Sequence, residues 1–246
     1  MPSGNFERGT GFVFNHPIKG GGDADFLVTC KHVVENSEYC EFFFSTQKPA
    51  PGWTARQLDL GQAVDFRVGK YEENWFPNPD SNVDVAIMPL IPILLELEKT
   101  GTDCYINTLQ SSMCPTADTI RRLDVREEFA FIGYPYGFYD ERHLLPLIRS
   151  GWTASPVDLN FEGFPGFAVE AHFHPGSSGS PLVSLGYELS EDENGYVKKL
   201  SKQFLIGMAA NMLQSPAGEE IGLGKAIRWE FITETVVLYL QSKGLW

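Results

Sequence analysis

Short apolar runs recur along the chain, separated by glycine, proline, asparagine and aspartate, and a sustained period of 3.6 residues is almost absent. Runs of this length predict β-strands, because a strand needs only about four to eight residues whereas a helix needs about ten or more. The expected strands cover residues 11–14, 25–29, 39–45, 63–68, 83–88, 129–133, 144–151, 166–172, 181–184 and 204–209. Many short strands at this spacing indicate an all-β barrel or sandwich.

Two segments depart from this pattern. Residues 33–36 predict a short helical turn. Residues 228–240 are amphipathic, which predicts a C-terminal helix that packs on the β body. The residues available for this packing are Phe231, Thr235, Val236, Leu238 and Tyr239.

A polar segment at residues 103–122, interrupted by Pro115, predicts a linker between two halves of the chain. A length of 246 residues suits one large domain or two small ones that share an interface. We therefore divide the chain into an N-terminal unit, residues 1–115, and a C-terminal unit, residues 116–246.

The charge balance is acidic: 32 Asp and Glu residues against 19 Lys and Arg residues give a formal net charge of -13. Such a field repels phosphate backbones, and no basic stripe offsets it, so no nucleic-acid partner is expected. The first residues have neither the basic nor the apolar region of a secretory signal. The most apolar stretch, residues 87–95, contains two prolines and is too short to cross a bilayer. We expect a cytoplasmic protein without a membrane partner.

The four cysteines, Cys30, Cys40, Cys104 and Cys114, form two pairs with the same internal spacing. Neither pair has the CxxC spacing that is typical of zinc and redox motifs. In a chain without a secretory signal, free thiols are the better expectation than disulfides. The sequence therefore predicts no metal site.

The most distinctive segment is Pro175-Gly176-Ser177-Ser178-Gly179-Ser180-Pro181, which lies between two apolar runs. Small residues around Ser178 allow a tight turn that exposes its hydroxyl and points consecutive backbone N–H groups at one spot, where an oxyanion can develop. This pattern is typical of a nucleophile loop. A plain hairpin rich in glycine and serine would have the same composition.

Two further residues could complete a nucleophilic site. His32 follows a strand-like run that ends in Thr29, and its imidazole could act as a general base, although a single histidine is more often a surface or hydrogen-bonded residue. Asp84 lies within the apolar run 83–88. Because aspartate is disfavoured in strands and costly to bury, it needs a partner such as an imidazole N–H. Asp80 is a less buried rival for this role.

The order of these residues along the chain narrows the class of enzyme, because serine sites on different folds place the three residues differently. All five histidines precede Ser178. An α/β-hydrolase needs its histidine after the serine and is therefore excluded for Ser178; Ser180 also replaces the last glycine of the GxSxG motif of that fold. The order His32, Asp84, Ser178 fits a catalytic triad.

These motifs resemble those of the chymotrypsin-like serine peptidases, most nearly the bacterial trypsin-like branch that includes the HtrA proteases. Val28-Thr29-Cys30-Lys31-His32 resembles Val-Thr-Ala-Ala-His of that family, and Asp84-Val85-Ala86-Ile87 resembles Asp-Ile-Ala-Leu. Gly176-Ser177-Ser178-Gly179-Ser180-Pro181 resembles Gly-Asn-Ser-Gly-Gly-Pro. Gly9-Thr10-Gly11-Phe12-Val13 and Phe131-Ile132-Gly133-Tyr134-Pro135 match the starts of the two halves, so the resemblance covers nearly the whole chain.

The resemblance implies an all-β fold of two six-stranded antiparallel β-barrels with a C-terminal helix. It also implies a serine endopeptidase that cleaves protein or peptide substrates and needs no cofactor. His32 and Asp84 would come from the first barrel and Ser178 from the second. Ser178 would attack the carbonyl, His32 would take its proton, Asp84 would hold the imidazole, and the N–H groups of Gly176 and Ser178 would form the oxyanion hole.

The substrate residue before the cleaved bond inserts its side chain into a pocket of the enzyme. The same resemblance implies that residues 172–175 form a wall of this pocket. Ala210, Asn211 and Met212 would pair with the substrate as an edge strand. His172 at the base of this pocket argues against a preference for Lys or Arg, and leaves acidic or amide side chains as the expectation. Alternatively, His172 and His174 are neutral packing residues.

Some features depart from the family pattern. Ser177 replaces the acidic residue that pairs with a newly cut N-terminus in secreted trypsins, so that activation is not expected. Ser180 stands where most relatives have glycine, and Ala210 stands where many relatives have a hydroxyl near the catalytic aspartate. No PDZ-like region is expected after residue 246, unlike in HtrA proteins.

Two other interpretations stay open. One is a catalytically idle double barrel that binds peptides or partner proteins. The other is a viral-type peptidase, although those often have cysteine at the position of Ser178. An activating partner protein would be needed if the oxyanion loop of the free enzyme is collapsed at rest.

Overall fold

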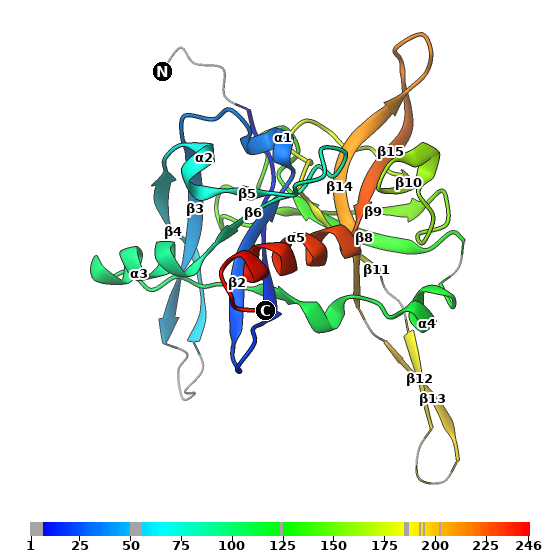
Figure 1. Ribbon diagram of the computed structural model, residues 1–246, viewed down its shortest axis with the longest axis horizontal. Coiled ribbons are helices and arrows are strands. Elements are labelled where there is room, and N and C mark those ends of the chain that lie inside the picture. Colours follow the sequence, from blue (N-terminus) through cyan, green and yellow to red (C-terminus); the bar gives the residue numbers. More distant parts are fainter. Residues whose placement is uncertain are drawn as a thin grey trace.

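The C-terminal half of the chain forms a closed β-barrel (Figure 1). The structure, a computed structural model, describes residues 7–49, 56–123, 125–184, 187–191, 193, 195–201 and 203–246. Six strands close the barrel in the order β10-β15-β14-β11-β8-β9. They are β8 (Glu128–Gly133), β9 (Leu147–Thr153), β10 (Gly166–Glu170), β11 (Pro181–Ser184), β14 (Phe204–Gln214) and β15 (Glu220–Arg228).

The N-terminal half contains two separate sheets. A five-stranded sheet has the order β5-β6-β2-β1-β7, and β3 and β4 form a two-stranded hairpin. The strands are β1 (Phe12–Pro17), β2 (Asp23–Thr29), β3 (Cys40–Pro49), β4 (Arg56–Val68), β5 (Phe76–Pro77), β6 (Ala86–Pro89) and β7 (Thr108–Gln110).

The expected second six-stranded barrel is not confirmed, because these two sheets do not close in the described part of the chain. An isolated antiparallel bridge between Thr46 and Cys104 joins β3 to the segment that leads into β7. No ladder links β4 to β5 among the described residues, and β5 is only two residues long. A shared apolar interior still fills the space between hairpin and sheet: Phe44 and Val68 from the hairpin belong to the same buried cluster as Leu27 and Met88 from the sheet.

The segment expected as a linker, residues 103–122, is instead part of the fold. β7 lies inside it and pairs in parallel with β1, so that Val13 lies opposite Thr108. A short α4 (Ala117–Ile120) follows, and the Thr116 hydroxyl caps it by accepting a hydrogen bond from the Thr119 N–H. The sequence did not predict β7 or α4 within this segment, because strand pairing depends on a distant partner, which a polar composition does not reveal.

The remaining helices are short apart from the last. They are α1 (Lys31–Val34), α2 (Tyr71–Asn74), α3 (Ile91–Lys99) and α5 (Trp229–Ser242). The helical turn expected at residues 33–36 overlaps α1, whereas α3 was not predicted from its proline-containing sequence. No helix in the described residues is both long and apolar enough to span a membrane.

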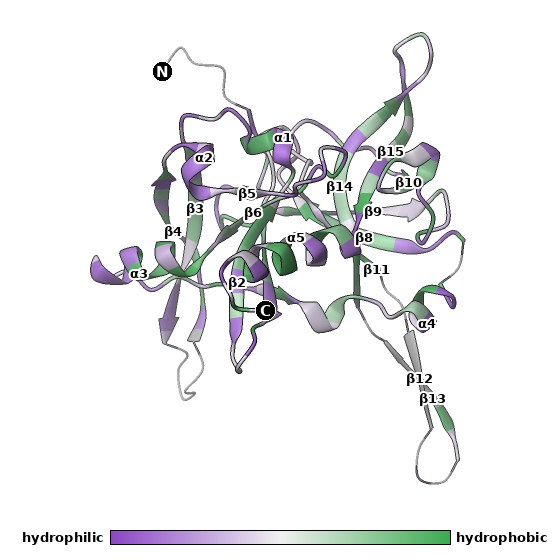
Figure 2. Ribbon diagram, in the orientation of Figure 1, coloured by the Kyte–Doolittle hydropathy of each residue, from purple (hydrophilic) through white to green (hydrophobic). Residues whose placement is uncertain are grey.

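Helix α5 confirms the expected amphipathic C-terminal helix, and it carries both hydrophobic and hydrophilic residues in Figure 2. It packs across to the N-terminal half of the chain. Its Thr235 hydroxyl accepts a hydrogen bond of 2.8 Å from the buried Asn78 amide. The Tyr239 ring makes edge contacts with Phe26 and Phe76, each at 5.5 Å between centroids. The helix therefore ties the last residues of the chain to the first sheet.

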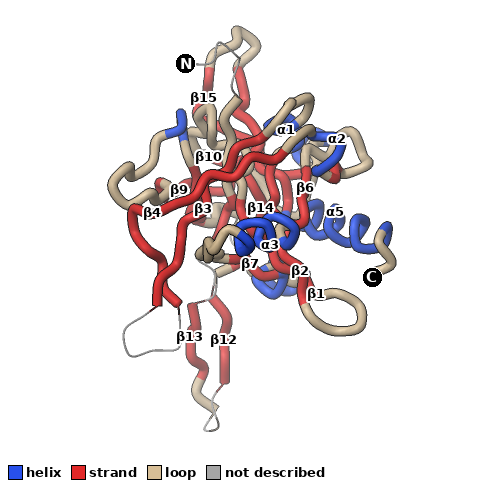
Figure 3. The backbone as a smooth tube through the Cα atoms, turned by 90° about the vertical axis from the view of Figure 1, so that its left-hand side faces the viewer, coloured by secondary structure: helices blue, strands red, loops and turns tan. Residues whose placement is uncertain are grey.

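Each expected strand overlaps an observed strand, but the boundaries differ at one position that matters. β6 begins at Ala86, so Asp84 precedes the strand instead of lying inside it. The sequence pattern did not predict β15 or a projecting hairpin formed by β12 (Tyr187–Glu191) and β13 (Val197–Ser201). Figures 1 and 3 both show this hairpin extending away from the body of the protein.

The main hydrophobic core runs through both halves. One buried cluster contains Phe14 and Phe26 from the first sheet together with Phe129, Phe167 and Leu205 from the barrel. The two halves thus pack on each other over a continuous apolar interface.

Candidate active site

His32 and Asp84 meet at the end of the first sheet. β2 and β6 are antiparallel, and Thr29 pairs with Ala86, so the residues just after β2 and just before β6 come together. Asp84 Oδ1 accepts a hydrogen bond of 2.9 Å from the His32 backbone N–H. Asp84 Oδ2 lies 2.5 Å from His32 Nδ1. The carboxylate therefore fixes both the position and the orientation of the imidazole.

The surroundings of His32 favour its charged form. The hydrogen bond to Asp84 raises the pKa of His32, burial opposes this, and the negative charges of Asp84, Glu7 and Glu35 add to the rise. Among the described residues, the second ring nitrogen, Nε2, has no hydrogen-bond partner. An imidazole held through Nδ1 can accept a proton on Nε2, as a general base must.

The serine-rich loop between β10 and β11 turns at two glycines. Gly176 has φ +93° and Gly179 has φ +88°, a region that side chains disfavour. A Cβ atom at Gly176 would lie 2.3 Å from the Tyr134 carbonyl oxygen, and one at Gly179 would lie 2.0 Å from the Thr10 carbonyl oxygen. Only glycine fits these two positions, so the nucleophile-loop interpretation gains a steric reason.

Thr10, two residues before β1, clamps this loop to the rest of the molecule. Its backbone N–H donates to Ser178 O at 2.8 Å, and its hydroxyl donates to Gly176 O at 2.8 Å. The same hydroxyl accepts a hydrogen bond of 3.1 Å from Tyr134 N–H, and Thr29 Oγ1 donates to Thr10 O at 2.7 Å. The sequence motif contained Thr10, but its spacing alone did not indicate this role.

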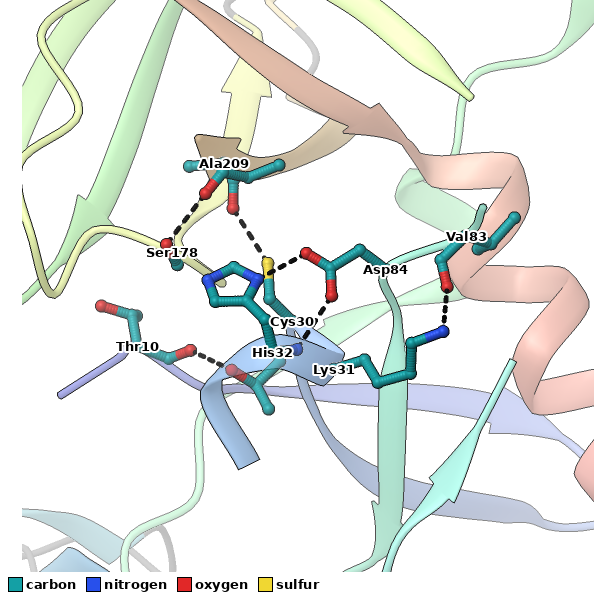
Figure 4. Close-up of polar contacts among 10 residues, drawn as sticks. Thr10, Cys30, Lys31, His32, Val83, Asp84, Ser178 and Ala209 are labelled. Carbon is teal, nitrogen blue, oxygen red and sulfur yellow. Dashed lines mark hydrogen bonds and ion pairs between the residues drawn. The ribbon is translucent and has the colours of Figure 1, made fainter. Parts of the chain in front are cut away.

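Ser178 and His32 line the same cleft, which has a volume of about 470 Å³. Figure 4 shows the imidazole between the carboxylate of Asp84 and Ser178. The Ser178 hydroxyl donates to the Ala210 carbonyl oxygen at 2.8 Å, and the described contacts include no hydrogen bond from it to His32. The three residues come together, with the serine hydroxyl turned toward the barrel.

Two backbone N–H groups expected to form the oxyanion hole are those of Gly176 and Ser178. In the described part of the chain, neither the Gly176 N–H nor the Ser178 N–H has a hydrogen-bond partner. The Pro175 carbonyl oxygen accepts a hydrogen bond from Tyr136 N–H. In a trans peptide the N–H points away from the carbonyl, so the Gly176 N–H faces away from Tyr136 and is free to bind an acceptor.

The residues expected to contact substrate lie beside this loop. Asn211 and Met212 are in β14, where they pair with Lys225 and Gly224 of β15. β11 pairs with β14 only up to Met208, so the other edge of residues 210–212 has no strand partner in the described structure. Met212 Sδ accepts the Phe173 N–H at 3.0 Å, which brings this strand against the segment of residues 172–175.

The histidines of that segment form a ring stack. His174 stacks on Tyr136 with centroids 5.0 Å apart, and His172 follows at 6.3 Å. Tyr136, with φ +53°, also lines the cleft. Its place could not be read from the sequence, because no pattern within residues 134–138 refers to residues 172–174.

Cys30 is a third group near Asp84. All four cysteines are free thiols, and the Cys30 Sγ donates to the Ala209 carbonyl oxygen at 3.2 Å. Possible ligand atoms of Cys30, His32 and Asp84 lie within 4.8 Å of one another. Burial, and then the charge of Asp84, raise the pKa of the Cys30 thiol. A cysteine binds a metal ion as the thiolate, and the raised pKa keeps Cys30 protonated, so this environment does not favour a metal ion.

Comparisons with known proteins found similarity only among solved structures. No protein-family model matches the chain, and no curated protein matches it. The structure of the HtrA-type protease AlgW with a decapeptide is 17% identical, with a TM-score of 0.44, over 89% of this chain and 51% of that one. AlgW with a tripeptide is 16% identical, with a TM-score of 0.45, over 96% and 60% of the two chains. The chain therefore spans about half to three fifths of the length of these HtrA-type protease structures.

Proposed function

We propose that the protein is a serine endopeptidase with His32, Asp84 and Ser178 as its catalytic triad. The observation that carries the proposal is that the Asp84–His32 pair and the glycine-flanked Ser178 come from different halves of the chain and yet line one cleft. A carboxylate that holds an imidazole beside a serine hydroxyl is the arrangement needed to activate that hydroxyl as a nucleophile.

In the reaction, Ser178 Oγ attacks the carbonyl carbon of the peptide bond and its proton passes to His32 Nε2. Asp84 stabilises the resulting imidazolium through the short contact to Nδ1. The N–H groups of Gly176 and Ser178 bind the oxyanion of the tetrahedral intermediate. His32 then donates its proton to the leaving amine, and water hydrolyses the acyl-enzyme with His32 again as the base.

Substrate binding also explains how the serine hydroxyl becomes available. At rest it donates to the Ala210 carbonyl oxygen. A peptide that adds to the free edge of residues 210–212 offers a backbone N–H to that same oxygen. The substrate N–H displaces the serine hydroxyl, which then turns toward His32 Nε2. Binding of the peptide backbone would thus release the Ser178 hydroxyl for the reaction.

The two halves of the chain take the roles expected of paired barrels. The unit of residues 1–115 supplies His32 and Asp84, and the unit of residues 116–246 supplies Ser178 and the oxyanion hole. We interpret the N-terminal sheets as the first barrel of a chymotrypsin-like pair, open between β4 and β5. Helix α5 and the clamp at Thr10 hold the two units together.

A fluorophosphonate that labels activated serines tests the proposal, with intact mass as the readout. We expect one adduct on the native protein and none on Ser178→Ala or His32→Ala. Ser180→Ala removes a hydroxyl from the same loop, and His143→Gln breaks another His–Asp pair, in which Nδ1 lies 2.7 Å from Asp140. Both control variants should be labelled. If the native protein takes no label even with candidate peptides present, it is the idle peptide-binding module and the proposal is wrong.

A further inference from the structure

Three basic residues, Arg149, His172 and His174, form a cluster at the segment of residues 172–175. Arg149 lies on β9 directly opposite Phe131 of β8, and its guanidinium carbon is 4.9 Å from the centre of the Phe131 ring. The Phe131 ring in turn makes an edge contact with Phe173 at 5.3 Å. Phe173 is the residue between His172 and His174 in the chain, so the Phe131 and Phe173 rings connect the guanidinium to the segment of residues 172–175.

Arg149 differs from the other arginines that lie over aromatic rings. Arg67 over Tyr39, Arg126 over Trp152 and Arg228 over Phe231 each have a glutamate within 3.4 Å. In the described part of the chain, Arg149 has no such carboxylate. This is unexpected in a protein with a net charge of -13.

One N–H group of the Arg149 guanidinium also has no hydrogen-bond acceptor among the described residues. Its Nη1 atom is buried and has no hydrogen-bond partner among the described residues. Burial lowers the pKa of Arg149, but a guanidinium remains charged throughout the range in which proteins fold. A buried, charged N–H without a partner is costly, and a carboxylate is the acceptor that fits a guanidinium best.

The two histidines lie between Arg149 and the cleft, where their ring N–H groups are further hydrogen-bond donors. Burial and then the charges of Arg149 and His172 lower the pKa of His174, and the one opposing charge is Glu220. His174 stacks on Tyr136, and Tyr136 lines the cleft together with Ser178. The cluster therefore begins at the wall of the cleft and continues away from the nucleophile.

We propose that Arg149, with His172 and His174, selects a carboxylate side chain, Glu or Asp, on the substrate residue that precedes the cleaved bond. The inference rests on the proposed function, because it names the substrate class of the same cleft. Because Met212 contacts Phe173, a peptide paired with residues 210–212 would lie next to the segment of residues 172–175. Nη1 is buried in the free protein, so the Arg149 side chain would turn toward the bound peptide, whose carboxylate would supply the acceptor that Nη1 lacks.

Fluorogenic peptides that differ only at the residue before the cleaved bond test this inference, with Glu, Asp, Gln, Leu and Lys at that residue. We expect kcat/KM for Glu to exceed that for Gln by at least about tenfold, as for a charge-assisted hydrogen bond in a partly buried site. In Arg149→Gln the Glu-to-Gln ratio should fall by about the same factor. Arg126→Gln changes another arginine that lies over a ring and should keep the native ratio.

Labelling by the fluorophosphonate separates failure of the inference from failure of the proposed function. If the native protein is labelled at Ser178 but cleaves the Glu and Gln peptides equally well, or prefers Leu, the inference is wrong and the peptidase stands. If it is neither labelled nor active on any peptide, the proposed function is wrong and the inference falls with it. Should Arg149→Gln not fold, His172→Asn changes an exposed side chain and must lower the Glu-to-Gln ratio at least threefold; an unchanged ratio overturns the inference.

Discussion

Replacing Thr10 by valine would test whether the nucleophile loop depends on a clamp from the other half of the chain. Thr10 is buried, and its hydroxyl donates to Gly176 O at 2.8 Å and accepts from Tyr134 N–H at 3.1 Å. Valine keeps the branched shape but has a methyl group in place of the hydroxyl. Thr10→Val therefore removes two hydrogen bonds and leaves their partners in place.

The expected loss of stability follows from those partners. The buried Gly176 carbonyl, once unpaired, costs about 1–3 kcal/mol, and the part-buried Tyr134 N–H costs less, so the free energy of unfolding should fall by about 2–4 kcal/mol. A domain of this kind has a total of about 5–15 kcal/mol, so the variant should still fold. The Gly176 carbonyl shares its peptide with the Ser177 N–H, so its release would loosen the loop next to the Gly176 N–H, which is one donor of the proposed oxyanion hole.

Urea unfolding followed by tryptophan fluorescence measures the first effect, and the rate of fluorophosphonate labelling measures the second. Thr10→Ser keeps the hydroxyl and should stay within about 1 kcal/mol of the native protein. Thr46→Val removes an exposed hydroxyl, whose contact with Gln62 O is 3.5 Å, and should change stability by less than about 0.5 kcal/mol.

A native free energy of unfolding in Thr10→Val would refute the clamp, because the loss of one buried and one part-buried hydrogen bond must lower the stability. A lower stability with a native labelling rate would refute the second step, in which the clamp holds the loop that carries the Gly176 N–H.

Three further predictions concern the triad and its loop. Asp84 raises the pKa of His32, and catalysis needs the neutral imidazole. As the pH is lowered, kcat/KM should therefore fall with a midpoint above the usual imidazole pKa. A midpoint at or below the usual imidazole pKa would contradict the short contact between Asp84 and His32. Asp84→Asn should move this midpoint to lower pH and reduce kcat by about 10⁴-fold, so a variant within about tenfold of native activity would exclude Asp84 from the triad. Gly176→Ala adds a Cβ atom 2.3 Å from the Tyr134 carbonyl oxygen at φ +93°, so thermal unfolding should show a lower midpoint and labelling should slow, and native values for both would show that the loop is not confined.

Much of the local structure was determined by the sequence alone. Each expected strand overlaps an observed one, and α5 begins one residue after the predicted start. These features depend on the alternation of neighbouring side chains, which is visible within a single segment. The order of His32, Asp84 and Ser178 similarly restricted the class of site before any geometry was known.

Other features depend on residues that are far apart in the chain, and only the tertiary structure decided them. The parallel pairing of β7 with β1, the open edge between β4 and β5, and the clamp from Thr10 to Gly176 all join segments whose local patterns do not refer to one another. The donation of the Ser178 hydroxyl to Ala210, and the lack of an acidic partner for Arg149 in the described structure, are likewise invisible in the sequence. Periodicity records which face of a segment is buried, but the identity of a hydrogen-bond or ion-pair partner is set by packing in three dimensions.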